Sequence, residues 1–144
     1  MPFAIIDTNV YVDHWEGVLP DNSLADLRER FIVRQSSIVL SELRRGARTA
    51  QARRLVDGLR RLAKIQWTPI AVDWWEAADI IQRVGDAQSW DRRKRQEFQN
   101  DVLIALSARR HGATVITTNR SDFELLSKET RVEILFVNAS PIGH

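Results

Sequence analysis

The stretch "AIIDTNVYVD", residues 4–13, has three apolar residues followed by Asp7, Thr8 and Asn9. Together with Phe3, this apolar run has the length and the polar boundary of a short strand that is buried on both faces. A carboxylate directly after such a strand has two ordinary roles. It caps the next helix, or it faces a ligand beyond the carboxyl end of the sheet. Which role applies depends on where the other acidic residues fall.

The composition of the chain limits the kinds of site that it can contain. Its 144 residues are enough for one domain with a sizeable core, and we expect a single domain over residues 1–144. The absence of cysteine excludes disulfides, thiolate zinc sites and cysteine nucleophiles, and the three histidines are far apart in the sequence. Any metal would therefore bind oxygen ligands. Neither a signal peptide nor a membrane-spanning run is recognisable, so the cytoplasm is the expected compartment.

Short apolar runs alternate with helical patterns along the chain. The expected strands cover residues 3–7, 31–36, 63–67, 113–118 and 132–137. The expected helices begin near residues 9, 24, 37, 50, 73, 91 or 96, and 119, and Gly112 is expected to end one of them in a left-handed conformation. This alternation predicts an α/β fold, with a parallel sheet and helices on both of its faces.

Acidic and basic residues are unevenly distributed. Residues 1–30 contain six acids and two bases, a local charge of −4, whereas residues 42–64 contain eight bases and two acids, a local charge of +6. Within the basic segment, residues 50–64 form an amphipathic helical pattern with Leu55, Leu59 and Leu62 on one face. Such a charge asymmetry indicates a polyanionic partner.

The helical pattern of residues 74–84 is apolar over an arc too wide for one core-facing side. It begins with Trp74 and Trp75. Part of this helix is therefore expected to serve an interface with another chain.

Two carboxylates are expected to point into the fold from helices. Apolar residues lie at offsets of three, four and seven from Asp101, so its side chain belongs to the inward face of its helix. Glu42 follows Ile38 and Val39 in the same way. Asn119 and Asp122 come just after the strand at residues 113–118, the place that Asp7 occupies on the first strand. Carboxylates are almost never fully buried without a partner.

Each of these acids has an alternative structural explanation. Asp7 or Thr8 and Ser121 or Asp122 could be helix caps, Glu42 could be solvated, and Asp101 could pair with a distant arginine. If all four acids converge, however, each pair at about 4 Å repels by roughly 4 kcal/mol at an effective dielectric constant of about 20. Protons or a cation must then neutralise the cluster, and a site of oxygen ligands alone favours Mg²⁺ or Mn²⁺.

Four blocks of the sequence resemble the PIN domain nucleases, and among them the VapC-type toxins of bacterial type II toxin-antitoxin pairs. The blocks are "IIDTNVYVD", "SSIVLSELRRG", "DVLIALSARRHGATVITTN" and "TNRSDF", in the order typical of that family. The resemblance implies a three-layer α/β/α sandwich with a mostly parallel central sheet. It further implies a Mg²⁺-dependent endoribonuclease, a homodimer, and a cognate antitoxin protein in the groove of the active site. The implied metal ligands and catalytic acids are Asp7, Glu42, Asp101 and Asp122.

The residues around these acids suggest further roles. Thr8 and Asn119 are expected to position a carboxylate, a water or the scissile phosphate in the catalytic site. With Asp7 assigned to the metal, Thr8 and Asn9 are expected to do the helix capping. Five arginines are expected to bind the RNA backbone, with a solvated helix face as the equally ordinary alternative: Arg44, Arg45, Arg48, Arg92 and Arg93.

Three other functions are compatible with part of this pattern. A PIN ribonuclease that processes RNA without being a toxin would have the same motifs, and a neighbouring antitoxin gene would distinguish the two. A Mg²⁺-binding receiver domain of signalling proteins also places acids at strand ends, but it requires paired acids after the first strand and a lysine after a late one, and this chain has neither. A pure interaction module would be indicated if the acids proved to be dispersed.

Overall fold

The computed structural model describes residues 1–138, which form six strands and seven helices. The strands are β1 (Phe3–Ile6), β2 (Ile32–Val33), β3 (Gln35–Ser36), β4 (Gln66–Trp67), β5 (Thr114–Thr117) and β6 (Glu133–Phe136). The helices are α1 (Thr8–Trp15), α2 (Ser23–Arg30), α3 (Ser37–Gly46), α4 (Ala50–Leu62), α5 (Ala71–Gln88), α6 (Arg92–Arg110) and α7 (Arg120–Thr130). The predicted alternation of strands and helices is thus present.

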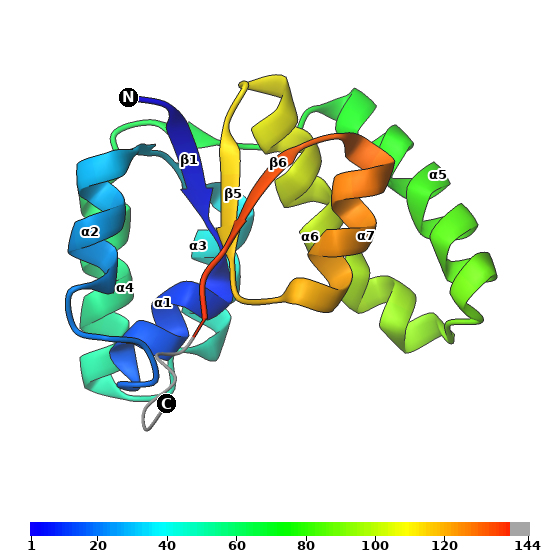
Figure 1. Cartoon of the computed structure of the whole chain (residues 1–144). Helices are drawn as coiled ribbons and strands as arrows, with labels where there is room; N and C mark the ends of the chain where they lie inside the picture. Colours follow the sequence, from blue (N-terminus) through cyan, green and yellow to red (C-terminus); the bar gives the residue numbers. More distant parts are fainter. Residues whose placement is uncertain (139–144) are drawn as a thin grey trace, which may run out of the picture.

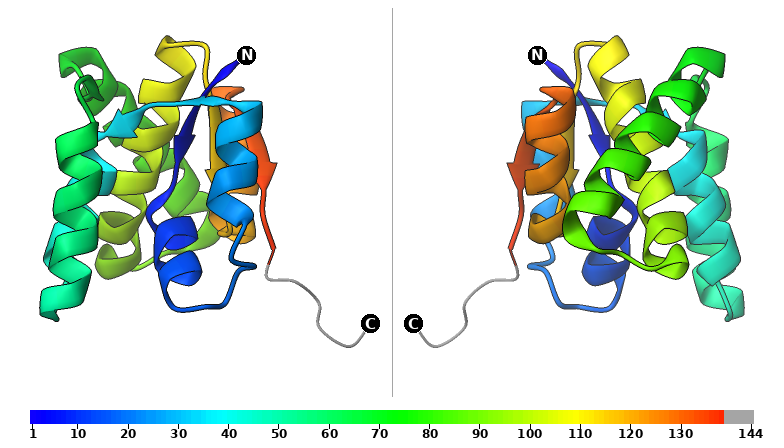
Figure 2. Two further views of the ribbon diagram at one scale, coloured as in Figure 1. Left: turned by 90° about the vertical axis from the view of Figure 1, so that its left-hand side faces the viewer. Right: turned by 90° about the vertical axis from the view of Figure 1, so that its right-hand side faces the viewer.

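The central sheet has the strand order β2-β1-β5-β6, and all of its neighbouring strands run parallel. In Figure 1, α1, α2 and α4 lie to the left of the strands and α5, α6 and α7 to the right. The side views of Figure 2 show β1 between α4 on one side and α2 on the other, so these two helices belong to different layers. The architecture is the predicted three-layer α/β/α sandwich, in which each parallel strand is covered by helices because crossover connections place them there.

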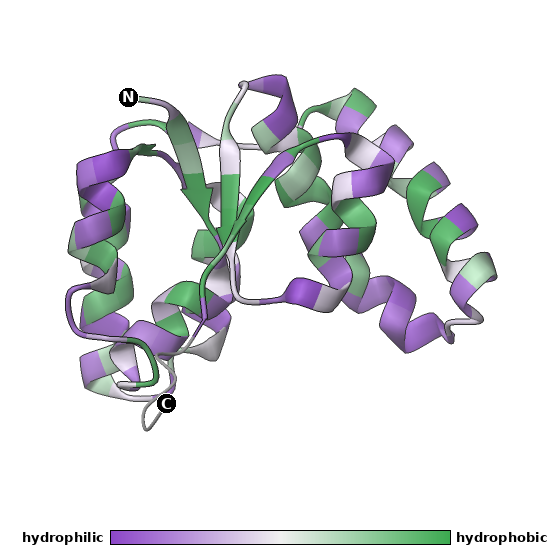
Figure 3. Cartoon of the chain, viewed as in Figure 1, coloured by the Kyte–Doolittle hydropathy of each residue, from purple (hydrophilic) through white to green (hydrophobic). Residues whose placement is uncertain are grey.

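The core forms around β1, β5 and α6. Ile5 and Ile6 of β1 and Val115 and Ile116 of β5 are almost completely buried, as the short apolar runs predicted. The strands appear hydrophobic in Figure 3, whereas α2 carries many hydrophilic residues. Residues 102–108 of α6 are buried in succession, so the helix is covered on all sides there. Asp101 precedes that buried run, and so the helix carries a carboxylate into the interior.

Residues 31–36 do not form the single strand that their sequence pattern predicted. β2 pairs with β1 in the central sheet, while β3 pairs with β4 in a separate two-stranded sheet. The chain changes sheets at Arg34, whose backbone amide still bonds to the Ala4 carbonyl. A continuous strand would pair with one neighbouring strand along its whole length. Here residues 32–33 pair with β1 and residues 35–36 pair with β4.

The apolar faces of two helices also differ from the predictions. On α4, Leu59 and Val56 are buried, but Leu55 is 38% exposed and Leu62 is 82% exposed. The predicted leucine face therefore packs only at its centre, because α4 rests mainly on α3 and is open elsewhere. On α5, Trp74 and Trp75 are 49% and 82% exposed, which agrees with an apolar arc wider than the core needs. Gly112 has the predicted positive φ, at 66°.

A partly buried ion pair joins the start of α5 to the end of α6. Asp73 Oδ2 accepts a hydrogen bond from the Ile70 backbone amide at 3.0 Å, and it pairs with Arg110 Nη2 at 2.9 Å. The side chains are 7% and 29% exposed, respectively. None of the helices within residues 1–138 has the length and apolar character that a membrane span requires.

Replacing Asp73 with alanine is expected to lower the free energy of unfolding by about 2 to 4 kcal/mol, because it removes a helix cap and leaves Arg110 without its buried partner. The measurement is urea unfolding at neutral pH. Asp79→Ala on the same helix is the matched control, since its pair with Arg83 is exposed and should contribute less than about 1 kcal/mol. Equal losses in the two variants would contradict the importance of the buried pair.

Candidate active site

Asp7 lies directly after β1, at the carboxyl edge of the sheet. The parallel register pairs Ile6 with Ile116, which brings Asp7 beside Thr117 of β5. Thr117 Oγ1 donates to Asp7 Oδ2 at 2.8 Å, and the Thr8 backbone amide donates to Asp7 Oδ1 at 2.8 Å. Burial raises the pKa of Asp7 to about 6, the two hydrogen bonds oppose that rise, and the charge of Glu42 adds to it.

The expectation that Thr8 and Asn9 would replace Asp7 as the helix cap is wrong. Asp7 is the N-cap residue of α1. One of its oxygens serves the cap and the other accepts from Thr117, so capping occupies only one oxygen of this carboxylate. The Thr8 hydroxyl is instead directed to another acid.

Glu42 on α3 is joined to the first strand end through Thr8. The Thr8 hydroxyl donates to Glu42 Oε1 at 2.8 Å, while Asn100 Nδ2 lies 3.4 Å from Glu42 Oε2. Asn100 precedes Asp101 on α6, so the bond brings α3 and α6 together at the site. Glu42 is intermediate in exposure, neither fully buried nor freely solvated.

Asp101 on α6 is the carboxylate with the most strongly altered pKa. Its pKa rises from 3.8 to about 8, first because burial disfavours the charged form and then because Asp7, Glu42 and Asp122 repel it. Asp101 therefore lies close enough to the other three predicted acids for their charges to act on it. Perturbed groups of this kind concentrate at functional sites.

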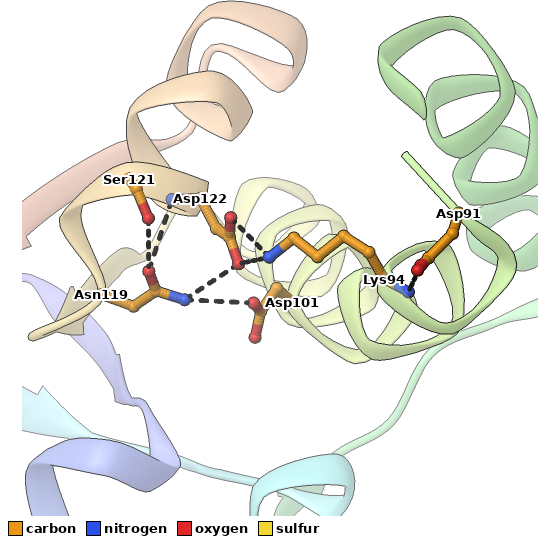
Figure 4. Close-up of polar contacts among 6 residues, drawn as sticks. All are labelled: Asp91, Lys94, Asp101, Asn119, Ser121 and Asp122. Carbon is orange, nitrogen blue, oxygen red and sulfur yellow. Dashed lines mark hydrogen bonds and ion pairs between the residues drawn. The ribbon is translucent and has the colours of Figure 1, made fainter. Parts of the chain in front are cut away.

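Asn119 and Asp122 complete the cluster from the start of α7 (Figure 4). Asn119 Oδ1 accepts from the Asp122 backbone amide at 3.3 Å and so caps the helix. Its amide nitrogen lies 3.4 Å from Asp101 Oδ2 and 3.2 Å from Asp122 Oδ2. Asn119 thus bridges two acids from different helices. The cap that could have been Ser121 or Asp122 is Asn119 itself.

Lys94 of α6 reaches into the same cluster. Its Nζ lies 2.8 Å and 3.0 Å from the two carboxylate oxygens of Asp122 (Figure 4). The two side chains are 33% and 11% exposed, so the ion pair is largely shielded from water. The cluster consequently contains one cationic group of the chain itself.

The chemistry of the donors suits a hard divalent cation. The cluster offers carboxylate, amide and hydroxyl oxygens, which are the ligands that Mg²⁺ and Mn²⁺ prefer. Within residues 1–138 no three acidic or histidine side chains are arranged to hold an ion as they stand. Binding would therefore require the carboxylates to draw together around the ion.

The five arginines expected to bind substrate are all exposed. Arg48 lines a cavity of about 370 Å³ that also contains Thr8 and Glu42, together with apolar residues such as Trp15 and Leu43. Arg93 pairs with Glu97 of its own helix at 3.2 Å. Of the remaining three, Arg44 and Arg45 lie in the last turn of α3, and Arg92 is the first residue of α6.

Three polar partners of the acids were missed in the sequence. Lys94 is seven residues before Asp101, two helical turns, and this spacing could have placed both side chains on one face. Thr117 ends the strand beside Asp7, so a prediction of strand order could have identified it. No local pattern distinguishes Asn100, which contacts an acid 58 residues away.

Comparison with known proteins finds one matching family and several similar structures. The sequence model of the PIN domain family matches residues 4–129. Among solved structures, VapBC2 from Rickettsia felis bound to a DNA fragment from its promoter is similar, with a TM-score of 0.66 and 19% identity over 94% of this chain and 99% of that one. VapBC-1 from nontypeable Haemophilus influenzae gives a TM-score of 0.67 and 19% identity over 93% and 97% of the two chains. For VapBC-5 from Mycobacterium tuberculosis the TM-score is 0.56 and the identity 24%, over 95% and 100%.

These structural similarities establish a common fold. No curated protein matches the chain significantly.

Proposed function

The chain belongs to the PIN domain family, and from this premise we propose that it is a metal-dependent endoribonuclease acting as the toxin of a toxin-antitoxin pair. PIN domains are typically nucleases, and nothing in the cluster of this chain departs from that chemistry. The observation that carries the proposal is the gathering of four acids from the end of β1 and from α3, α6 and α7 through shared polar partners, a setting in which burial and the other three carboxylates raise the pKa of Asp101 to about 8. A fold that retains such repulsion is expected to use it for binding a cation.

In this proposal Asp7 and Asp101 would hold Mg²⁺ or Mn²⁺, with Glu42 and Asp122 as ligands directly or through water. The chemistry that such an ion would supply is an activated water for in-line attack on the phosphodiester and neutralisation of the charge that develops on the phosphate. The chain itself supplies polar partners that orient the carboxylates before an ion draws them together. Thr117 orients Asp7, Thr8 orients Glu42, and Asn119 contacts both Asp101 and Asp122.

The exposed arginines support a polyanionic substrate. Arg48 borders the cavity beside Glu42, and Arg92 and Arg93 begin the helix that carries Asp101. We assign these three, with Arg44 and Arg45, to the phosphates of an RNA strand. Contacts of this type provide affinity that depends on salt and little reading of sequence.

The antitoxin belongs to the same proposal. Three of the similar solved structures are the VapBC proteins named above; VapBC-5 is described as a member of a family of toxin-antitoxin systems, and VapBC2 as bound to a DNA fragment from its promoter. The cavity beside Glu42 has an apolar wall formed by residues such as Val12, Trp15 and Leu43. A partner segment with an apolar face and a basic group could fill this cavity and neutralise Glu42 at its end. Such a segment would block the cluster.

A homodimer is the proposed state of the chain in the cytoplasm. Ile70, Val72, Trp74 and Trp75 are exposed around the first turns of α5. Apolar residues gathered in this way are typical of a protein interface.

The gene beside the one for this chain distinguishes the two roles of a PIN ribonuclease. A gene for a small DNA-binding protein would indicate a toxin with its antitoxin, and its absence would indicate a ribonuclease that processes RNA.

Incubation of the purified protein with RNA and Mg²⁺ is expected to cleave the RNA at internal positions, whereas DNA of the same sequence should stay intact. A chelator should stop the reaction, and added Mn²⁺ should restore it, because the acids need a divalent ion to act. The products are read by sequencing their ends. Cleavage that persists in excess chelator would contradict the metal-dependent mechanism, and cleavage of DNA alone would contradict the RNA assignment.

A further inference from the structure

We propose that Lys94 is a built-in counter-ion that takes the place of one divalent cation at Asp122, so that the acidic cluster binds a single metal ion. The inference rests on the proposed function, because it concerns how many ions that site holds. It assigns to Asp122 the role of anchoring an ammonium group. This narrows the proposed ligand set, which included Asp122, to Asp7, Glu42 and Asp101.

The ammonium group of Lys94 occupies both oxygens of Asp122. The distances from Nζ are 2.8 Å and 3.0 Å, and Asn119 Nδ2 contributes a further contact at 3.2 Å to Oδ2 (Figure 4). Three donor contacts therefore converge on one carboxylate that is only 11% exposed. A carboxylate has about four lone-pair sites, so a second metal ion bound through both oxygens of Asp122 would have to displace at least one of these donors.

Lys94 is also held in place along its length. Asp91 Oδ1 accepts from the Lys94 backbone amide at 2.9 Å, which fixes the first turn of α6. The ammonium group lies 5.0 Å from the centre of the Trp90 ring, and that ring packs edge-to-face on Phe98 at 4.8 Å. Cation–π contact of this kind favours the charged group close to the ring. The lysine is thus directed toward Asp122 by its own helix and by the residues before it.

Contacts of Arg95 hold the connection between α5 and α6, which precedes Lys94 in the chain. Arg95 Nε donates to the Trp90 carbonyl at 3.0 Å, and Arg95 Nη1 pairs with Asp86 at 2.9 Å. This guanidinium packs against Gly85, where a Cβ would lie only 2.8 Å from Arg95 Cζ. The α5–α6 connection is therefore closely fitted around the segment that presents Lys94.

The ammonium charge of Lys94 also disfavours a second metal ion at Asp122. In two-metal sites the ions lie about 3.5 to 4 Å apart. An ammonium group fixed at Asp122 would repel an ion at that distance, so it substitutes for the second ion.

The test is calorimetric titration of the full chain with Mn²⁺, comparing the wild type with Lys94→Met. The wild type is expected to bind one ion per chain and Lys94→Met two, since methionine keeps much of the side-chain volume but removes the charge. Lys128→Met is the matched control, because this lysine is exposed on α7 and makes the same change in net charge. It should bind one ion. Thermal melting without metal establishes that each variant is folded.

The possible outcomes separate the inference from the proposed function. One ion in Lys94→Met, or two in the wild type, would overturn the counter-ion role while the metal site remained. No binding of Mn²⁺ by the wild type would overturn the proposed function and this inference with it. Should Lys94→Met fail to fold, Lys94→Gln carries the same expectation of a second ion.

Discussion

Replacing Asp101 with asparagine is expected to lower the rate of RNA cleavage by at least about 100-fold, since even the outer partners of metal ligands cost about 10- to 100-fold when they are removed. Asparagine has nearly the same shape but cannot supply the charge that holds the ion. The measurement is the initial rate of cleavage of a labelled RNA in saturating Mg²⁺. Far-ultraviolet circular dichroism should be unchanged.

The control for this prediction is Asp79→Asn, which makes the same chemical change at an exposed site on α5. It should cleave at the wild-type rate. If Asp101→Asn cleaved as fast as this control, Asp101 would not be part of the catalytic site. The raised pKa of Asp101 would then be a structural feature without a catalytic consequence.

Without metal, the wild-type protein is expected to lose stability as the pH rises. The pKa of Asp101 is about 8 in the fold, against 3.8 for an ordinary aspartate, and the pKa of Asp7 is about 6. Between these ordinary and raised values the folded protein binds more protons than the unfolded chain, so raising the pH favours unfolding. Each excess proton contributes a slope of about 1.4 kcal/mol per pH unit, so the loss between about pH 5 and pH 8 should reach several kcal/mol.

Asp101→Asn should flatten this dependence, because asparagine resembles the protonated acid and does not titrate. The variant should therefore exceed the wild type in stability most at about pH 8, and the difference should shrink toward acid pH. Urea unfolding in the presence of a chelator gives both curves. The pKa of His111, lowered by burial and by Arg110, contributes a slope of opposite sign at acid pH that is common to both proteins. Parallel curves would contradict the raised pKa of Asp101.

Much of this fold could be predicted because local patterns specify which side of an element faces inward. The apolar run before Asp7 predicted a buried strand, and β1 is almost fully buried. Apolar neighbours at helical spacing placed Asp101 on the inward face of α6, where burial now raises its pKa. The exposed tryptophans of α5 likewise follow from an apolar arc that is too wide for a core face.

Other features of the fold depend on which strands and helices pack beside one another, and a local sequence pattern does not contain that information. Residues 31–36 had the composition of one strand, but two different sheets pair with its two halves. The leucines of α4 had the spacing of a buried face, but the neighbouring α3 covers only part of it. The sequence predicts Thr8 and Asn9 as the caps of α1, but the N-cap residue is Asp7. The fold lets one carboxylate oxygen cap the helix while the other meets Thr117.

The sequence by itself determined the class of fold, the residues of the family motifs and the inward direction of the acids, because helical and strand periods act over a few residues. Only the tertiary structure decided which partners those acids meet. Asp7 meets Thr117 across 110 residues of sequence, and Asp122 meets Lys94 across 28. Such pairings follow from the order and register of strands and from the packing of α6 beside α7. These depend on the whole chain, since burial is a property of the assembled core.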